Sequence, residues 1–168
     1  MKKSVRMFLG GMGLACIVAL PMALAGPRED GVAAYVRGDY ATALKLLRPL
    51  ADQGDAGGQF HLGRMYYTGY GVPQGYAEAV KWFRKAAEQG FALAQHNLGD
   101  MYYLGQGVPQ HFVLAHKWYN LAATRYRFPE KEPTNRNELI KRRDLVAAKM
   151  TPAQIAEAQK LAREWKPK

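Results

Sequence analysis

Residues 55–90 and 91–126 carry the same 36-residue pattern twice, and this repeat constrains the fold more than any other feature of the chain. A repeat of this period is typical of solenoids, in which each unit buries its apolar face only against its neighbours. We therefore predict an all-α fold, a right-handed α–α superhelix of helix–turn–helix repeats. The residues of the first copy that recur in the second are Ala56, Gln59, Leu62, Gly63, Met65, Tyr66, Tyr67, Gly69, Gly71, Val72, Pro73, Gln74, Ala79, Lys81, Trp82, Ala86 and Ala87.

Each copy is expected to form two helices joined by a glycine-rich turn. In the first copy the helices are predicted over 56–68 and 74–89, because glycine permits positive φ and proline cannot continue a helix. The turn is Gly69-Tyr70-Gly71-Val72-Pro73. In the second copy the helices are predicted over 92–104 and 110–124. The Gly-x-Gly turns lack the remaining spacing of a phosphate-binding loop, so we interpret them as structural.

The segments on either side of the two copies extend the solenoid. Residues 38–54 align at the same offset with the second helix of a repeat, with Asp39 as N-cap and a short helix before it over 30–37. A further helix is predicted over 137–149, and a last one begins at Thr151, whose Thr-Pro-Ala-Gln sequence is a capping box. The predicted parts are a leader over 1–25, a degenerate repeat over 26–54, repeats over 55–90 and 91–126, and basic capping helices over 127–168.

The N-terminus has the pattern of a secretory signal peptide. Lys2, Lys3 and Arg6 precede an apolar run over 7–22, and Ala23-Leu24-Ala25 provides the small residues of a cleavage site. We expect cleavage near Ala25 and a periplasmic or secreted protein. The alternatives are a membrane anchor and lipid attachment at Cys16, the only cysteine. Cleavage would leave no cysteine for a disulfide or thiol chemistry.

Positive charge is concentrated in the last third of the chain. Residues 26–124 hold 9 Lys+Arg against 8 Asp+Glu, a net charge of +1, whereas residues 125–168 hold 12 against 6, a net charge of +6. A solvated pair of capping helices explains this imbalance, and an alternative is contact with anionic lipid, cell-wall polymer or an acidic partner. Nucleic acid is disfavoured because the chain is expected to be exported.

The repeat unit resembles the Sel-1-like repeat, a relative of the tetratricopeptide repeat with a longer turn between its helices. The resemblance is carried by Ala-x-x-Gln-x-x-Leu-Gly-x-Met-Tyr-x-x-Gly-x-Gly-Val-Pro-Gln, followed by Ala-x-Lys-Trp and Ala-Ala, and covers about residues 38–126. It implies an adaptor or scaffold in protein–protein complexes. Some cysteine-rich secreted members are linked with penicillin binding or hydrolysis, but this chain lacks their paired cysteines. Where the family often has Asp or Asn to cap the second helix, this chain has Gly75 and His111.

The variable positions of the repeat indicate a binding face. Helical spacing places Gly57, Phe60, Arg64 and Tyr67 on one face of the first helix, and the second copy has Leu93, His96, Asp100 and Tyr103 there. The tetratricopeptide resemblance implies that this is the concave face, which holds a peptide or partner helix. The candidate partner-binding residues are therefore Phe60, Arg64, Tyr67, His96, Asp100 and Tyr103. Equally, Tyr67 and Tyr103 could fill space between units.

Catalysis finds little support in the sequence. No two histidines have the helical zinc spacing, and no nucleophile-elbow, His-Glu-x-x-His or P-loop motif occurs. We expect a non-enzymatic envelope scaffold with a protein or peptide partner, no metal, no cofactor and no small-molecule substrate. One alternative is a cell-wall hydrolase or penicillin-binding activity. Another is electrostatic attachment to anionic lipid or polymer through Arg136, Lys141, Arg142 and Arg143.

Overall fold

The computed structural model describes residues 26–125 and 136–168, and within these ranges the regular structure is entirely α-helical. The predicted signal segment over 1–25 therefore lies outside the described residues. The helices are α1 (Pro27–Val36), α2 (Tyr40–Asp52), α3 (Ala56–Thr68), α4 (Tyr76–Glu88), α5 (Ala92–Leu104), α6 (Phe112–Arg125), α7 (Arg136–Ala147) and α8 (Pro152–Glu164). The prediction of an all-α fold is confirmed. No helix in the described ranges is both long enough and apolar enough to cross a membrane.

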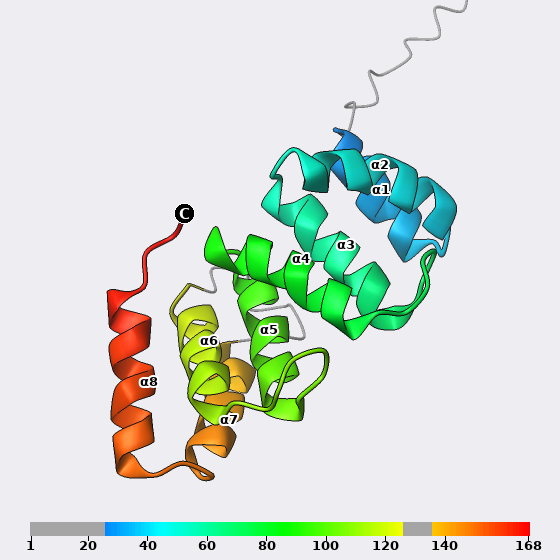
Figure 1. The fold of residues 1–168 in the computed structure, drawn as a ribbon. Helices are drawn as coiled ribbons and strands as arrows, with labels where there is room; N and C mark the ends of the chain where they lie inside the picture. The colour runs from blue at the N-terminus through cyan, green and yellow to red at the C-terminus, as the bar shows by residue number, and fades with distance from the viewer. Residues whose placement is uncertain (1–25, 126–135) are drawn as a thin grey trace, which may run out of the picture.

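The helices stack as consecutive pairs. Helices α1 and α2, α3 and α4, and α5 and α6 form the pairs, while α2 packs on α3 and α4 packs on α5 to join one pair to the next. Figure 1 shows these pairs following one another along the molecule in chain order. Each pair thus contacts mainly its neighbours in sequence, which is the arrangement of a solenoid.

Within each pair the helices approach closely at a glycine. A Cβ atom added to Gly63 on α3 would lie 2.7 Å from a ring carbon of Phe83 on α4, so only glycine leaves room for the ring. Phe83 is 1% exposed, which shows that this contact lies in the core. The same geometry recurs where Gly99 faces Tyr119 and where Gly31 faces Leu47.

The glycine-rich turns close the repeat and also join it to the repeat before. Gly105 and Gly107 both have φ of 70°, a left-handed conformation that favours glycine. A Cβ on Gly107 would lie 2.4 Å from the backbone of Tyr76, at the start of α4, so this turn packs directly on the preceding pair. The amide of Gln110 then donates to the carbonyl of Tyr103 at 2.7 Å. The structural interpretation of the Gly-x-Gly turns is confirmed.

A buried glutamine in each full repeat bonds to the helix before it. Gln59 donates from Nε2 to the carbonyl of Ala51 at 3.2 Å, and Gln95 donates to the carbonyl of Ala87 at 3.1 Å. Both carbonyls lie in the last turn of a helix, and each also accepts a hydrogen bond from the backbone N–H of the glycine after that helix, Gly54 or Gly90. The repeated glutamine therefore fixes the register between one helix pair and the next.

The predicted helix starts are largely confirmed. Asp39 accepts a hydrogen bond from the backbone N–H of Thr42 at 3.1 Å, and the Thr151–Gln154 capping box is complete. Gly75 provides no side-chain cap for α4, as its identity predicts. Helix α2 continues through Pro49 to Asp52.

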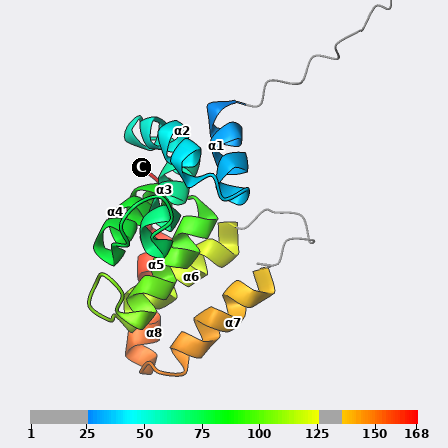
Figure 2. The ribbon, with the colours of Figure 1, turned by 90° about the vertical axis from the view of Figure 1, so that its right-hand side faces the viewer.

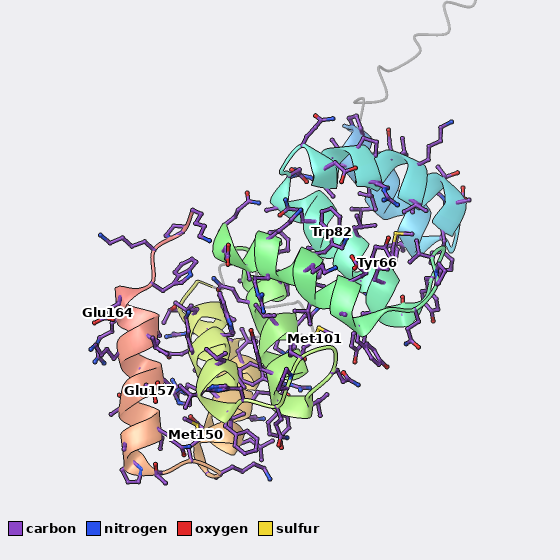
Figure 3. All side chains as sticks on the ribbon, in the orientation of Figure 1. Tyr66, Trp82, Met101, Met150, Glu157 and Glu164 are labelled. Atoms are coloured by element: carbon purple, nitrogen blue, oxygen red, sulfur yellow. The ribbon has the colours of Figure 1, made fainter. Side chains whose placement is uncertain are left out.

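The core is divided along the solenoid. One buried cluster lies among α1, α2 and α3 and includes Leu47 and Leu62, while a second runs from α3 to α8 and includes Phe83 and Leu98. Tyr66, labelled in Figure 3, packs against both clusters. Apolar packing is therefore continuous from the first helix pair to the last.

The C-terminal helices leave the repeating pattern. Both α7 and α8 pack against α6, whereas the two scarcely contact each other. Figure 2 shows them diverging from their connecting turn on different sides of α6. Trp165 follows α8 and meets Trp118 of α6 with ring centroids 6.4 Å apart. Helix α8 therefore covers α6 instead of pairing with α7.

We expect Gly63→Ala to lower the free energy of unfolding by up to about 2 kcal/mol. Overpacking against Phe83 costs about 1–3 kcal/mol, and the better helix propensity of alanine offsets about 1 kcal/mol of this cost. Urea unfolding measures the change. Gly57→Ala is the matched control on the same helix, because the nearest atom to its Cβ belongs to the movable side chain of Arg28. Equal stability of Gly63→Ala and Gly57→Ala would contradict the close-approach explanation.

Candidate functional site

The predicted binding residues lie along the first helix of each pair. We use the term first-helix face for Tyr35 on α1, Arg64 and Tyr67 on α3, His96, Asp100 and Tyr103 on α5, together with Arg142 on α7, which bonds to Asp100. Five of the six predicted residues are partly exposed on α3 and α5, and Tyr35 and Arg142 contact Arg64 and Asp100. The sixth, Phe60, is only 5% exposed.

Arg64 is held on aromatic rings at the α1–α3 end of this face. Its guanidinium carbon lies 5.1 Å from the ring centroid of Tyr35 and 5.9 Å from that of Phe60. Phe60 itself packs against Phe83 and Phe91. Such cation–π contacts contribute about 0.5–1 kcal/mol each at exposed sites and restrict the guanidinium to the plane above the rings. Phe60 therefore supports Arg64 from below, and its burial removes it as a direct partner contact in this structure.

Tyr67 and Tyr103 each bridge to the helix that follows. The Tyr67 ring lies 5.4 Å from Tyr76 and the Tyr103 ring lies 6.0 Å from Phe112, and in each case the partner is the first residue of the next helix. Both tyrosines are half-buried, so each has one side packed and one side accessible. Burial, with smaller contributions from Tyr76 and Asp100, raises the pKa of Tyr67, which keeps its hydroxyl protonated. The two roles considered for these tyrosines are therefore compatible.

Asp100 connects α5 to α6 and α7 at the C-terminal end of the first-helix face. It accepts a hydrogen bond from the Tyr119 hydroxyl at 2.6 Å and one from Nη1 of Arg142 at 2.8 Å. The Nε2 atom of His96 lies 3.5 Å from the other carboxylate oxygen. Burial lowers the pKa of His96, although the Asp100 charge opposes the shift. Asp100 is therefore committed to neighbours within the protein, and Arg64 is the cation on this face for which no carboxylate partner is found among the described residues.

Two residues of the face were missed in the sequence analysis. Tyr35 corresponds to Tyr67 and Tyr103 when the first helices are aligned on Gly31, Gly63 and Gly99, but the shorter connection between α1 and α2 places it outside the 36-residue offset. Arg142 had no such signal, because α7 does not follow the repeat. The sequence places it only among the basic residues of the C-terminal third, whereas in the structure it donates to Asp100.

His61 is half-buried and lies beside Tyr35 and Phe60, the two rings that Arg64 contacts. Its ring centroid is 5.1 Å from that of Phe60 and 5.9 Å from that of Tyr35. Burial, and then the positive charges of Arg64 and Arg28, lower the pKa of His61 to about 4. The imidazole is therefore neutral near pH 7.

We expect acidification to destabilise the protein partly through His61. Because its folded-state pKa of about 4 lies below the ordinary value of 6.5, its contribution to stability is full above pH 6.5 and is lost as the pH falls through 4. His61→Asn, which places here the residue of the equivalent position Asn97, should reduce the loss of unfolding free energy between pH 7 and pH 4 by up to about 3 kcal/mol. Urea unfolding at several pH values measures the free energy of unfolding of each variant. The control is His111→Asn, because His111 is exposed. An unchanged pH dependence in His61→Asn would refute the assignment.

The described residues contain no group of three or more His, Cys, Asp or Glu side chains placed to hold a metal ion. The first-helix face instead offers the guanidinium of Arg64, the half-buried rings of Tyr67 and Tyr103, and a carboxylate, Asp100, that is bonded within the protein. These groups suit contact with another chain, because aromatic and arginine side chains dominate the energetics of protein interfaces.

Comparison with protein families identifies the repeat. The model of the Sel1 repeat matches residues 22–55, 56–91 and 92–125. The first match includes α1 and α2, so the segment that resembles only half a repeat in the sequence forms a complete helix pair. No curated protein matches the chain significantly.

Solved structures show the same architecture. A protective antigen of uropathogenic Escherichia coli, c5321, which displays an SLR fold, superposes with a TM-score of 0.73 at 29% identity over 83% of this chain. A Sel1 repeat protein from Oxalobacter formigenes superposes with a TM-score of 0.58 at 28% identity, also over 83% of this chain. The matched region spans 29% of the first protein and 61% of the second, so both relatives are longer than the part they share with this chain.

Proposed function

Because the chain belongs to the Sel1 repeat family, we propose that it is a non-enzymatic scaffold that binds a protein or peptide segment on its first-helix face in the cell envelope. Sel1 repeats generally mediate protein–protein interactions. The proposal specifies the face, the form of the partner and the compartment.

The held guanidinium of Arg64 carries the assignment of the face. A long side chain normally loses rotamer entropy when it binds, at about 0.5–1.5 kcal/mol. Stacking on Tyr35 and Phe60 restricts Arg64 before any partner arrives. A partner segment with an Asp or Glu side chain could form a charge-assisted pair with it, while apolar side chains of the same segment contact Tyr67 and Tyr103.

The size of the face favours a segment over a whole domain. The face includes residues of α1, α3, α5 and α7, and at its α5–α7 end Asp100 is bonded to Tyr119 and Arg142. The groups left for a partner are therefore few and come from successive helices. An extended or helical peptide can contact them.

The electrostatic alternative has less support. Of the four basic residues proposed for it, Arg142 donates to Asp100 and Arg143 donates to Asp144 from both Nε and Nη2. Internal pairing reduces the positive charge that these residues can offer to a polymer or membrane surface.

We expect a triple variant, Arg64→Gln, Tyr67→Ala and Tyr103→Ala, to weaken binding of a selected peptide by at least about tenfold while far-ultraviolet circular dichroism stays unchanged. Phe60 is kept because its removal would disturb the core. Peptides would be selected by phage display on the purified protein and measured by fluorescence anisotropy. The control variant, Lys45→Gln with Arg48→Gln, changes exposed charges on α2, away from this face. Equal binding of the triple variant and the control would refute the proposed face.

The envelope location rests on the Lys2–Ala25 segment and has its own test. Expression in a Gram-negative host followed by intact-mass analysis of the exported fraction should give a chain that begins at Gly26. A chain that retains Met1, or one that carries lipid at Cys16, would contradict cleavage near Ala25.

A further inference from the structure

A second candidate site lies between α7 and α8, away from the first-helix face. The two helices diverge from the turn that contains Met150 (Figures 2 and 3). Residues of α6, α7 and α8 line a cleft between them, and the buried His116 of α6 lies at its floor. The cleft has a volume of about 370 Å³. This volume is enough for a small organic molecule or for the last residues of a peptide.

The floor of this cleft carries a histidine where the repeat is otherwise apolar. His116 on α6 corresponds to Val80 on α4 and Leu44 on α2 at the 36-residue offset. It is 3% exposed, and its Nδ1 atom has no hydrogen-bond partner among the described residues. A buried polar atom without a partner costs free energy that valine at this position would not. The histidine therefore replaces an apolar residue on α6, the helix that lines the cleft together with α7 and α8.

The walls of the cleft are polar and bear a small excess of positive charge. Its charged residues are Arg143 and Asp144 on α7 and Arg163 on α8, which gives two positive charges against one negative, a net charge of +1. Asp144 is already engaged, because its Oδ1 accepts from Nε and Nη2 of Arg143 at 2.9 and 2.8 Å. Arg163 has no ion pair within the described part of the chain. The uncharged hydrogen-bonding groups are the amides of Asn120 and Gln159.

We propose that this cleft binds a carboxylate, with Arg163 as its counter-ion and with His116 and Asn120 as hydrogen-bond donors. One carboxylate neutralises the single excess positive charge, and a guanidinium can bind it through two parallel hydrogen bonds. A phosphate dianion would leave an extra negative charge near Asp144. The carboxylate could belong to a small organic acid or to the C-terminus of a protein, and the two sources share this chemistry.

The neutral imidazole of His116 suits this role. Burial, and then the charge of Arg143, lower its pKa, while the charge of Asp144 opposes the shift. A bound carboxylate would add negative charge beside the ring and raise the pKa of His116. Binding can therefore be observed directly at this residue.

The proposal is tested by nuclear magnetic resonance on the purified protein at constant ionic strength. Acetate and a short peptide with a free C-terminal carboxylate should shift the His116 ring resonances in a saturable manner and raise the pKa of this histidine. The same peptide as its C-terminal amide should bind at least about tenfold more weakly, since it loses a charge-assisted hydrogen bond. Tighter binding of the peptide acid than of acetate identifies a protein C-terminus as the source, and equal binding identifies a small acid.

Substitutions distinguish carboxylate binding in this cleft from non-specific attraction of an anion to a positively charged surface. Arg163→Gln should weaken carboxylate binding about tenfold, whereas Lys160→Gln, which removes the same charge from α8 outside the cleft, should leave it within about twofold. His116→Val restores the residue of the preceding repeat and should keep the fold while abolishing carboxylate binding. Because this variant lacks the histidine, binding is followed at the resonances of the Asn120 side-chain amide. The proposal is overturned by the absence of a saturable shift with any carboxylate, by tighter binding of phosphate, or by equal effects of Arg163→Gln and Lys160→Gln.

Discussion

The close approach of paired helices at a glycine is the contact on which this structure depends. Gly63 leaves room for the Phe83 ring, and this ring is a fully buried member of the second cluster. Without that approach the second helix of each pair would be displaced, and the carbonyls bonded by Gln59 and Gln95 would no longer lie within reach. The stacking of the solenoid is thus a consequence of how closely each pair packs internally.

The same framework that builds the solenoid also divides its functional surfaces. Positions that recur in both copies are occupied by core and turn residues. Side chains that bind a partner or ligand in one repeat alone can therefore occur only at the positions that vary between the copies. Arg64 and Asp100 occupy one such position and have opposite charges, which makes one end of the first-helix face open and the other internally bonded. His116 varies in the last repeat, where α7 and α8 replace the usual neighbours. The two proposed sites therefore arise from different departures from one pattern.

Most of the local structure could be predicted from the repeat. The bounds of α3 and α5 agree with those predicted, and the caps at Asp39 and Thr151 form as their residue types indicate. The burial of Phe60 could not be predicted in this way, because spacing along a helix defines a face and does not reveal which neighbours cover it. Phe91 and Phe83 come from other helices, and only their packing shows that Phe60 supports Arg64 from beneath.

The sequence by itself determined the all-α class, the repeat length, the turns and the family, since these depend on local spacing, on glycine and proline chemistry, and on self-similarity. The tertiary structure decided how the last helices pack, that Arg142 bonds to Asp100, and that His116 lies at the floor of a cleft. The C-terminal helices do not follow the repeat, so their position depends on the apolar surface and hydrogen-bonding groups that α5 and α6 present to them. Those surfaces exist only once the preceding pairs have stacked.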